Sequence, residues 1–165
     1  MGIIKLGIIS LIVFFLIITG FSLFIPSHIR ISKAIDINTS KDLVMNQVNN
    51  PVNWKKWYPG ADTSTLLFVE GNIKGINTGE LNGLMIKATT DSTVSLINTG
   101  INSKRGASGW NIFEAGKPNT ITIQWYMDFH LRWYPWEKFS SLLLEKRYGP
   151  MMEQGLDKLK SILEQ

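Results

Sequence analysis

The sequence predicts an α+β domain in which an antiparallel sheet wraps a long C-terminal helix, preceded by one N-terminal transmembrane helix. Three observations predict it: an uncharged apolar run near the N-terminus, alternating segments separated by turn residues in the middle, and an apolar stripe at helical spacing near the C-terminus. Helices grouped at the ends of an antiparallel sheet are typical of α+β domains. A chain of 165 residues fits one such domain with an appended segment.

The apolar run extends from Leu6 to Ile25, and no charged residue lies between Lys5 and Arg30. A hydrocarbon core about 30 Å thick needs roughly 20 helical residues, so this run is long enough to cross it. A cleaved signal peptide is the alternative. However, the run exceeds the usual apolar region of about 7–15 residues, and Pro26 stands where cleavage would fall. We therefore predict an uncleaved anchor over residues 1–26 and a domain over residues 27–165.

The positive charges that flank the apolar run give a weak orientation signal. Lys5 and the terminal amine precede the run, whereas Arg30, Lys33 and Lys41 follow it. Positively charged flanks tend to stay in the cytoplasm. The margin of one charge favours a cytoplasmic domain over an external one.

The first part of the domain alternates between strand and helix patterns. Apolar and polar residues alternate over Ile29–Asn38, which predicts a half-buried strand that only Lys33 interrupts. A helix follows, with Thr39 or Ser40 as its N-cap. A second, short helix is predicted over Pro51–Trp57, with Trp54 and Trp57 three residues apart on one face.

The middle of the domain consists of candidate strands separated by turn residues. The clearest strand has five apolar residues alternating with polar ones between residues 120 and 130. A weak region rich in Gly and Asn lies between residues 71 and 80. We expect about five or six antiparallel strands, with candidates at Leu66–Glu70, Leu81–Thr89, Thr93–Asn98, Ser108–Glu114 and Thr120–His130.

The C-terminal segment is predicted to be helical. Its apolar stripe has the spacing i, i+4, i+7 and i+11, which predicts one face packed on a core. Gly155 lies within the stripe, as expected where a helix approaches a sheet closely. Gly149 and Pro150 are predicted to kink or break the helix upstream. The stripe residues are Met152, Leu156, Leu159 and Leu163.

The order of these elements resembles the START-like, or SRPBCC, superfamily with its helix-grip fold. Within it, the chain is most similar to membrane-anchored bacterial proteins of the polyketide cyclase/dehydrase-like kind. The resemblance implies a cavity between sheet and helix, and its members include lipid and sterol carriers, hormone receptors and aromatase/cyclases. It carries no catalytic signature onto this chain. The residues that carry it are Ile29–Asn38 running into Thr39-Ser40, Asn53-Trp54-Lys55-Lys56-Trp57, and Gly155-Leu156-Asp157-Lys158-Leu159-Lys160.

Composition excludes several classes of chemistry. The absence of Cys excludes disulfides, thiol catalysis and Cys-ligated metals. Two isolated His cannot supply a typical tetrahedral zinc site. The net charge of +4 is too small and too scattered to indicate nucleic-acid binding. The small basic loop Ser103–Gly106 is more typical of a solvated turn than of a phosphate site. We therefore predict no catalytic residue, metal, cofactor or nucleic-acid partner.

Large apolar side chains are the candidate cavity residues. All six Trp lie outside the anchor. Such side chains either line a cavity or fill it, since large aromatics dominate core energetics, and the pattern leaves both alternatives open. The candidates for a ligand cavity are Trp54, Trp57, Trp110, Trp125, Met127, Phe129 and Met152.

Three aromatic residues in the segment after the last strand are candidates for a membrane interface. Trp133, Tyr134 and Trp136 flank Pro135, and Trp and Tyr are favoured at the headgroup level of bilayers. The alternative is a packed corner that closes one end of the sheet, and the sequence favours this alternative.

Asp128 and His130 lie two residues apart on one strand face, close enough for a carboxylate–imidazole pair. The opposite face of that strand is apolar, so we predict that both side chains point to solvent.

The leading hypothesis is a monomeric, membrane-anchored domain that binds a small apolar or lipid-like ligand without catalysis. One alternative is a cyclase/dehydrase-like enzyme using cavity groups such as Tyr126 or Glu114. The other is a domain that docks another membrane protein through the sheet edge or the Trp133–Trp136 corner.

Overall fold

The computed structural model describes residues 2–79, 82–100 and 106–165. The predicted strand residue Leu81 and most of the predicted basic loop at 103–106 lie outside them. The elements follow the predicted order: α1 (Gly2–Ser22), β1 (His28–Ile37), α2 (Lys41–Asn49), α3 (Pro51–Trp57), β2 (Thr65–Val69), β3 (Asn72–Gly79), β4 (Asn82–Thr89), β5 (Thr93–Gly100), β6 (Gly106–Glu114), β7 (Ile121–His130), α4 (Pro135–Ser141) and α5 (Leu144–Leu163).

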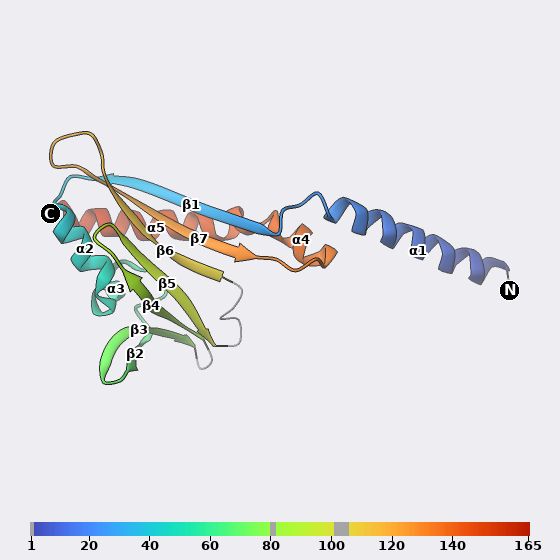
Figure 1. Ribbon diagram of the computed structural model, residues 1–165, viewed down its shortest axis with the longest axis horizontal. Coiled ribbons are helices and arrows are strands. Elements are labelled where there is room, and N and C mark those ends of the chain that lie inside the picture. Colours follow the sequence, from blue (N-terminus) through green and yellow to red (C-terminus); the bar gives the residue numbers. More distant parts are fainter. Residues whose placement is uncertain (1, 80–81, 101–105) are drawn as a thin grey trace.

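The described strands form one antiparallel sheet in the order β1-β7-β6-β5-β4-β3-β2 (Figure 1). Each strand from β2 to β6 pairs with the next strand along the chain, and β1 pairs with β7 at the edge of the sheet opposite β2. Their register runs from His28 opposite His130 to Ile37 opposite Ile121. The first and last strands are therefore neighbours.

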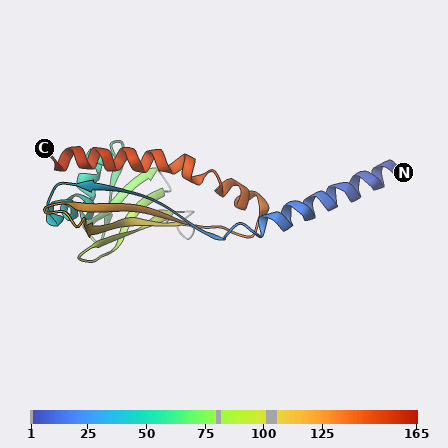
Figure 2. The same ribbon diagram turned by 90° about the horizontal axis from the view of Figure 1, so that it is seen from above.

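Helix α5 lies along one face of the curved sheet (Figure 2). Met152, Leu156 and Leu159 are buried against it, as the stripe predicts. A Cβ atom at Gly155 would lie 2.8 Å from the Trp125 ring. The absence of a side chain at Gly155 thus lets α5 approach the centre of the sheet closely.

The kink or break that the sequence predicts in the C-terminal helix at Gly149 and Pro150 lies elsewhere in the structure. Helix α5 continues through both residues, and the break falls at Leu142 and Leu143, between α4 and α5. Proline removes one helical hydrogen bond, which leaves the carbonyl four residues earlier without its partner. Both Pro150 and Lys146, which owns that carbonyl, are exposed, so water can satisfy the carbonyl oxygen.

Lys33, the polar residue that interrupts the first strand, lies on the inner face beside α5. Its Nζ is 2.8 Å from a carboxylate oxygen of Glu145 and 2.8 Å from one of Glu153. A Cβ at Gly149 would lie 3.2 Å from Lys33 Cε, so this glycine leaves room for the lysine stem. Hydrogen bonds to the two carboxylates raise the pKa of Lys33 above its ordinary value. Lys33 therefore joins β1 to α5 through these two ion pairs.

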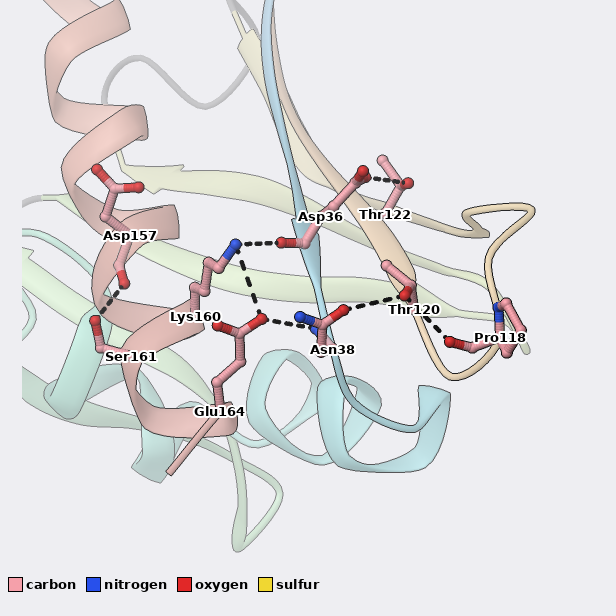
Figure 3. Close-up of polar contacts among 9 residues, drawn as sticks. All are labelled: Asp36, Asn38, Pro118, Thr120, Thr122, Asp157, Lys160, Ser161 and Glu164. Atoms are coloured by element: carbon pink, nitrogen blue, oxygen red, sulfur yellow. Dashed lines mark hydrogen bonds and ion pairs between the residues drawn. The ribbon is translucent and has the colours of Figure 1, made fainter.

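Polar contacts fasten the C-terminal end of α5 to the end of β1 (Figure 3). Lys160 Nζ donates to the Asp36 carbonyl at 2.9 Å. The Asn38 backbone N–H donates to Glu164 Oε1 at 2.8 Å. Thr120, the residue before β7, has its Oγ1 3.1 Å from Asn38 Oδ1. The contacts of Lys160 and Glu164 therefore hold the C-terminal end of α5 against the end of β1.

The sequence predicts Thr39 or Ser40 as the N-cap of α2. Ser40 occupies the cap position, but its side chain makes no capping hydrogen bond. The cap bond of α3 is made instead by Asn50, whose Oδ1 accepts from the backbone N–H of Val52 at 3.1 Å.

Helix α1 extends away from the domain at the end opposite the C-terminus (Figure 1). It is the one helix in the described residues that is long and apolar enough to cross a membrane, and a signal sequence near an N-terminus meets the same criterion.

Candidate functional site

A pocket of about 300 Å³ lies between the inner face of the sheet and α5. This volume is at the lower end of the range of about 300–1,000 Å³ for small-molecule sites. Five strands, β3 to β7, together with α5 and the segment after α3, contribute to its wall. The lining residues are Tyr58, Pro59, Thr78, Leu84, Asn98, Gly106, Ala107, Ser108, Met127, Asp128, Phe129, Tyr148 and Met151.

The pocket exists because the inward side chains of β6 change from large to small along the strand. Trp110 and Ile112 point into the core beside Trp125 and Ile123 of β7. Towards the start of β6 the inward positions are Ser108 and Gly106. This change from large to small residues at alternate positions is a signal in the sequence that pattern reasoning missed.

Met127 and Phe129 of β7 lie beside these small residues on the inner face of the sheet. Ser108 pairs with Met127, and Gly106 pairs with Phe129. The Phe129 ring also contacts the Tyr148 ring of α5, with centroids 5.2 Å apart. Sheet and helix thus meet across the pocket through aromatic contact.

Most polar side chains of the pocket lie near its opening to solvent. Thr78 and Asn98 are exposed, whereas Ser108 is buried deeper. Tyr58 carries a hydroxyl whose pKa is raised above its ordinary value because burial disfavours the phenolate. That hydroxyl therefore stays protonated at neutral pH and can donate a hydrogen bond.

The predicted cavity residues separate into two groups. Met127 and Phe129 line the pocket, whereas the other five lie in the packed core beside it. Trp110 lies centrally among the rings, 5.5 Å from Trp54, 5.4 Å from Trp57 and 6.0 Å from Trp125 between centroids. The core group is Trp54, Trp57, Trp110, Trp125 and Met152.

Tyr58 connects the packed rings to the pocket. Its ring contacts all four core Trp rings and also lines the pocket. Trp54 donates its indole N–H to the Val48 carbonyl at 2.8 Å. The indole nitrogens of Trp57, Trp110 and Trp125 are buried without a hydrogen-bond partner. The core beside Tyr58 therefore contains three indole N–H donors without a hydrogen-bond partner.

The carboxylate–imidazole pair considered for Asp128 and His130 does not form, because Asp128 contacts Arg30 and His28 on the outer face of the sheet. Arg30 donates from Nε and Nη2 to the two oxygens of Asp128, at 2.7 Å each. His28 Nε2 is 3.4 Å from Asp128, and its ring stacks on His130 at 4.6 Å.

The prediction that both side chains point to solvent is correct for His130, which is exposed, and wrong for Asp128. Asp128 is only 8% exposed because Arg30 covers it. The hydrogen bonds from Arg30 hold the pKa of Asp128 below its ordinary value. The carboxylate is thereby committed to an ion pair outside the pocket.

The two polar residues considered for an enzyme lie outside the pocket. Tyr126 lies on the outer face, where the Arg30 guanidinium is 4.6 Å from its ring centroid. Glu114 is at the far end of β6, beside the turn that precedes β7. Within the described ranges, no group of three or more His, Cys, Asp or Glu residues could hold a metal ion.

Comparison with models of known protein families identifies the family of this chain. A family model described as polyketide cyclase / dehydrase and lipid transport matches residues 28–164. The chain belongs to this family. Among proteins of curated function, none matches the chain.

Comparison with solved structures identifies the fold as START-like. A START superfamily protein from Mycobacterium smegmatis has a TM-score of 0.61 and 14% identity, covering 82% of this chain and 97% of that one. An uncharacterised protein from Bacillus thuringiensis has a TM-score of 0.61 and 14% identity, covering 82% and 98%. BexL, a di-domain ARO/CYC protein of the BE-7585A biosynthetic pathway, has a TM-score of 0.61 and 12% identity, covering 84% of this chain and 51% of BexL.

Proposed function

We propose that α1 anchors this START-like domain to a membrane and that the domain binds one small apolar or lipid-like ligand in the pocket. The observation that carries the proposal is the pocket itself, which lies between α5 and the small inward residues of β6. Apolar walls with a few polar groups are typical of small-molecule sites. The family's description, which includes lipid transport, supports the same class of ligand.

The chemistry of the wall favours binding over catalysis. Among the described residues that line the pocket, Asp128 is the one carboxylate residue, and Arg30 holds its side chain on the outer face. No His lines the pocket within residues 2–79, 82–100 and 106–165. A general acid or base needs a titratable group within reach of the reacting atoms, and in the described part of the lining the other titratable side chains are the tyrosines.

A cyclase/dehydrase-like enzyme is the second candidate, because Tyr58 places a protonated hydroxyl at the pocket beside the Trp rings. BexL, an ARO/CYC protein, shares the fold. A linear polyketide-like probe distinguishes the two proposals. Turnover that Tyr58→Phe abolishes would support the enzyme, whereas saturable binding without turnover would support the ligand-binding domain.

Tryptophan fluorescence tests ligand binding, because Tyr58 couples the pocket to four buried indoles. The full chain in lipid nanodiscs would be titrated with fatty acids, sterols and flat polycyclic aromatics, with empty nanodiscs as the blank. We expect a fluorescence change that saturates at one ligand per chain. An unsaturable change equal to the blank would reflect partition into lipid and contradict the proposal.

Two matched substitutions locate the bound ligand. Met151 on α5 lines the pocket, whereas Met45 on α2 does not, and both are partly buried helical residues that pack on the core. Met151→Trp should fill the pocket and weaken binding at least about tenfold, which corresponds to about 1.4 kcal/mol. Met45→Trp should leave affinity unchanged. Equal effects of both substitutions at equal Tm would place the ligand elsewhere.

A further inference from the structure

An exposed apolar surface covers α4 and the turn into α5. Trp133 and Trp136 are each 62% exposed, Leu142 is 65% exposed and Leu143 is 63% exposed. Phe139 of α4 is also exposed. Contiguous apolar surface of this kind marks an interaction site more often than single exposed residues do. We call this surface, formed by Trp133, Trp136, Phe139, Leu142 and Leu143, the α4 surface.

The α4 surface is held beside the end of α1. Helix α4 contacts α1, and the two elements are adjacent in both views (Figures 1 and 2). Lys138 of α4 is 3% exposed, and its Nζ donates to the Ile25 carbonyl at 2.8 Å and lies 2.7 Å from Ser27 Oγ. The buried lysine therefore fixes α4 to the segment where α1 ends.

Charge beside the α4 surface is mainly positive. Lys146 and Arg147 are exposed in the first turn of α5. The neighbouring carboxylates have cationic partners, since Glu137 pairs with Arg132 and Glu145 pairs with Lys33. Basic side chains near a bilayer surface are attracted to anionic lipid headgroups.

The aromatic rings that stack beside α4 are typical of a segment that lies at a membrane interface. Tyr134 stacks on Trp136 with centroids 4.8 Å apart and contacts Trp133 at 4.9 Å. Trp and Tyr are enriched at the headgroup level because one end of each ring system is apolar and the other polar. A packed corner would bury these rings, and the exposure of Trp133 and Trp136 is inconsistent with that alternative.

We propose that the α4 surface lies in the headgroup region of the bilayer that α1 crosses, with Lys146 and Arg147 directed to lipid phosphates. This inference rests on the proposed anchoring by α1. It has a consequence for the pocket, because α5 begins at this surface. Met151, which lines the pocket, follows Leu143 by eight residues, about 12 Å of helix. The pocket would therefore lie within reach of the membrane surface, and the bilayer would be the source of its ligand.

Single spin labels in nanodiscs of phosphatidylcholine and phosphatidylglycerol test the inference, and the absence of native Cys makes single-site labelling direct. Leu143→Cys reports on the α4 surface, and Phe14→Cys reports on the middle of α1. Phe68→Cys is the matched control, because Phe68 is also an exposed apolar residue, 60% exposed, but lies on β2 away from α1 (Figure 1). Collisions with oxygen report lipid, and collisions with a soluble nickel complex report water.

The expected result is that labels at positions 14 and 143 favour oxygen severalfold over the value at position 68. A label at 143 that matches position 68, with position 14 in lipid, would overturn the inference and leave the anchor intact. A label at 143 shielded from both reagents would also overturn it, because a protein would then cover the surface. A label at position 14 exposed to the nickel complex would refute the anchoring itself.

Discussion

At the scale of single residues, the two glycines of α5 differ in what surrounds them. A Cβ at Gly155 would meet the Trp125 ring at 2.8 Å and Pro59 Cδ at 2.9 Å, both rigid groups. A Cβ at Gly149 would meet the flexible end of Lys33 at 3.2 Å. The same substitution should therefore have opposite consequences at the two sites.

Gly155→Ala should lower the free energy of unfolding by about 1–3 kcal/mol, because overpacking a filled core exceeds the gain in helix propensity. Gly149→Ala is the matched control and should be neutral or stabilising by up to about 1 kcal/mol. Urea denaturation measures both. A Gly155→Ala variant more stable than the native chain would show that α5 does not lie against Trp125.

The ion pair of Arg30 and Asp128 gives stability a defined pH dependence. Because Arg30 lowers the pKa of Asp128 in the folded state, the contribution is present above the unfolded pKa of about 3.9. It is lost as pH falls through the lower, folded value. Asp128→Asn should therefore flatten the acid limb of the stability profile and cost about 1 kcal/mol at neutral pH.

Thermal unfolding between neutral and acid pH measures this effect. Asp62→Asn, which removes a carboxylate from an exposed position, controls for the change in net charge. An Asp128→Asn variant that keeps the acid limb of the native chain would show that the ion pair does not contribute.

The sequence predicts the role of single residues where the alternation of polar and apolar residues determines which side chains face inward. It does not predict interaction partners that are distant along the chain. The period of two residues correctly assigns the inner face of β7. It marks Lys33 as an exception but cannot identify Glu145 and Glu153, which lie more than 100 positions away. It also cannot tell whether an aromatic ring lines or fills a space, because both roles need the same inward position.

At the scale of elements, the apolar stripe of α5 packs the helix on the inner face of the sheet. Leu156 is 2% exposed, so Leu156→Asp would bury an unpaired carboxylate at a cost of several kcal/mol. That cost is comparable to the total stability of a domain, about 5–15 kcal/mol, and we expect loss of the cooperative transition in circular dichroism.

The matched control is Lys158→Asp, which introduces the same group two positions away on the exposed side of α5. This variant should retain the native melting behaviour. An unchanged Tm for Leu156→Asp would place this helix face in solvent and contradict the packing of α5 on the sheet.

The element boundaries that the sequence misplaces have physical reasons. Strand β3 contains Gly75, Asn77 and Gly79 and has low strand propensity, yet it forms because strands pair with it on both sides. Pro150 fails to end α5 because its lost hydrogen bond faces water. Tertiary pairing and solvent exposure decide both cases, and neither can be read from local composition.

At the scale of the whole molecule, the two ends of α5 have different roles. Its C-terminal end is fastened to β1 through Lys160 and Glu164. Its N-terminal half carries Tyr148 and Met151 on the pocket wall and starts beside α4 and the end of α1. Binding and membrane attachment would thus converge on one end of the domain.

Photocrosslinking in a bilayer tests the central claim of ligand binding most directly. Nanodiscs containing the full chain and a diazirine-labelled fatty acid would be irradiated, and the modified peptides would be identified by mass spectrometry. We expect modification of the peptides that contain Met127 and Phe129 or Tyr148 and Met151, and we expect Met151→Trp but not Met45→Trp to reduce it. Modification confined to α1 and the α4 surface, unchanged by Met151→Trp, would refute binding in the pocket, because the lipid would then contact the chain without entering it.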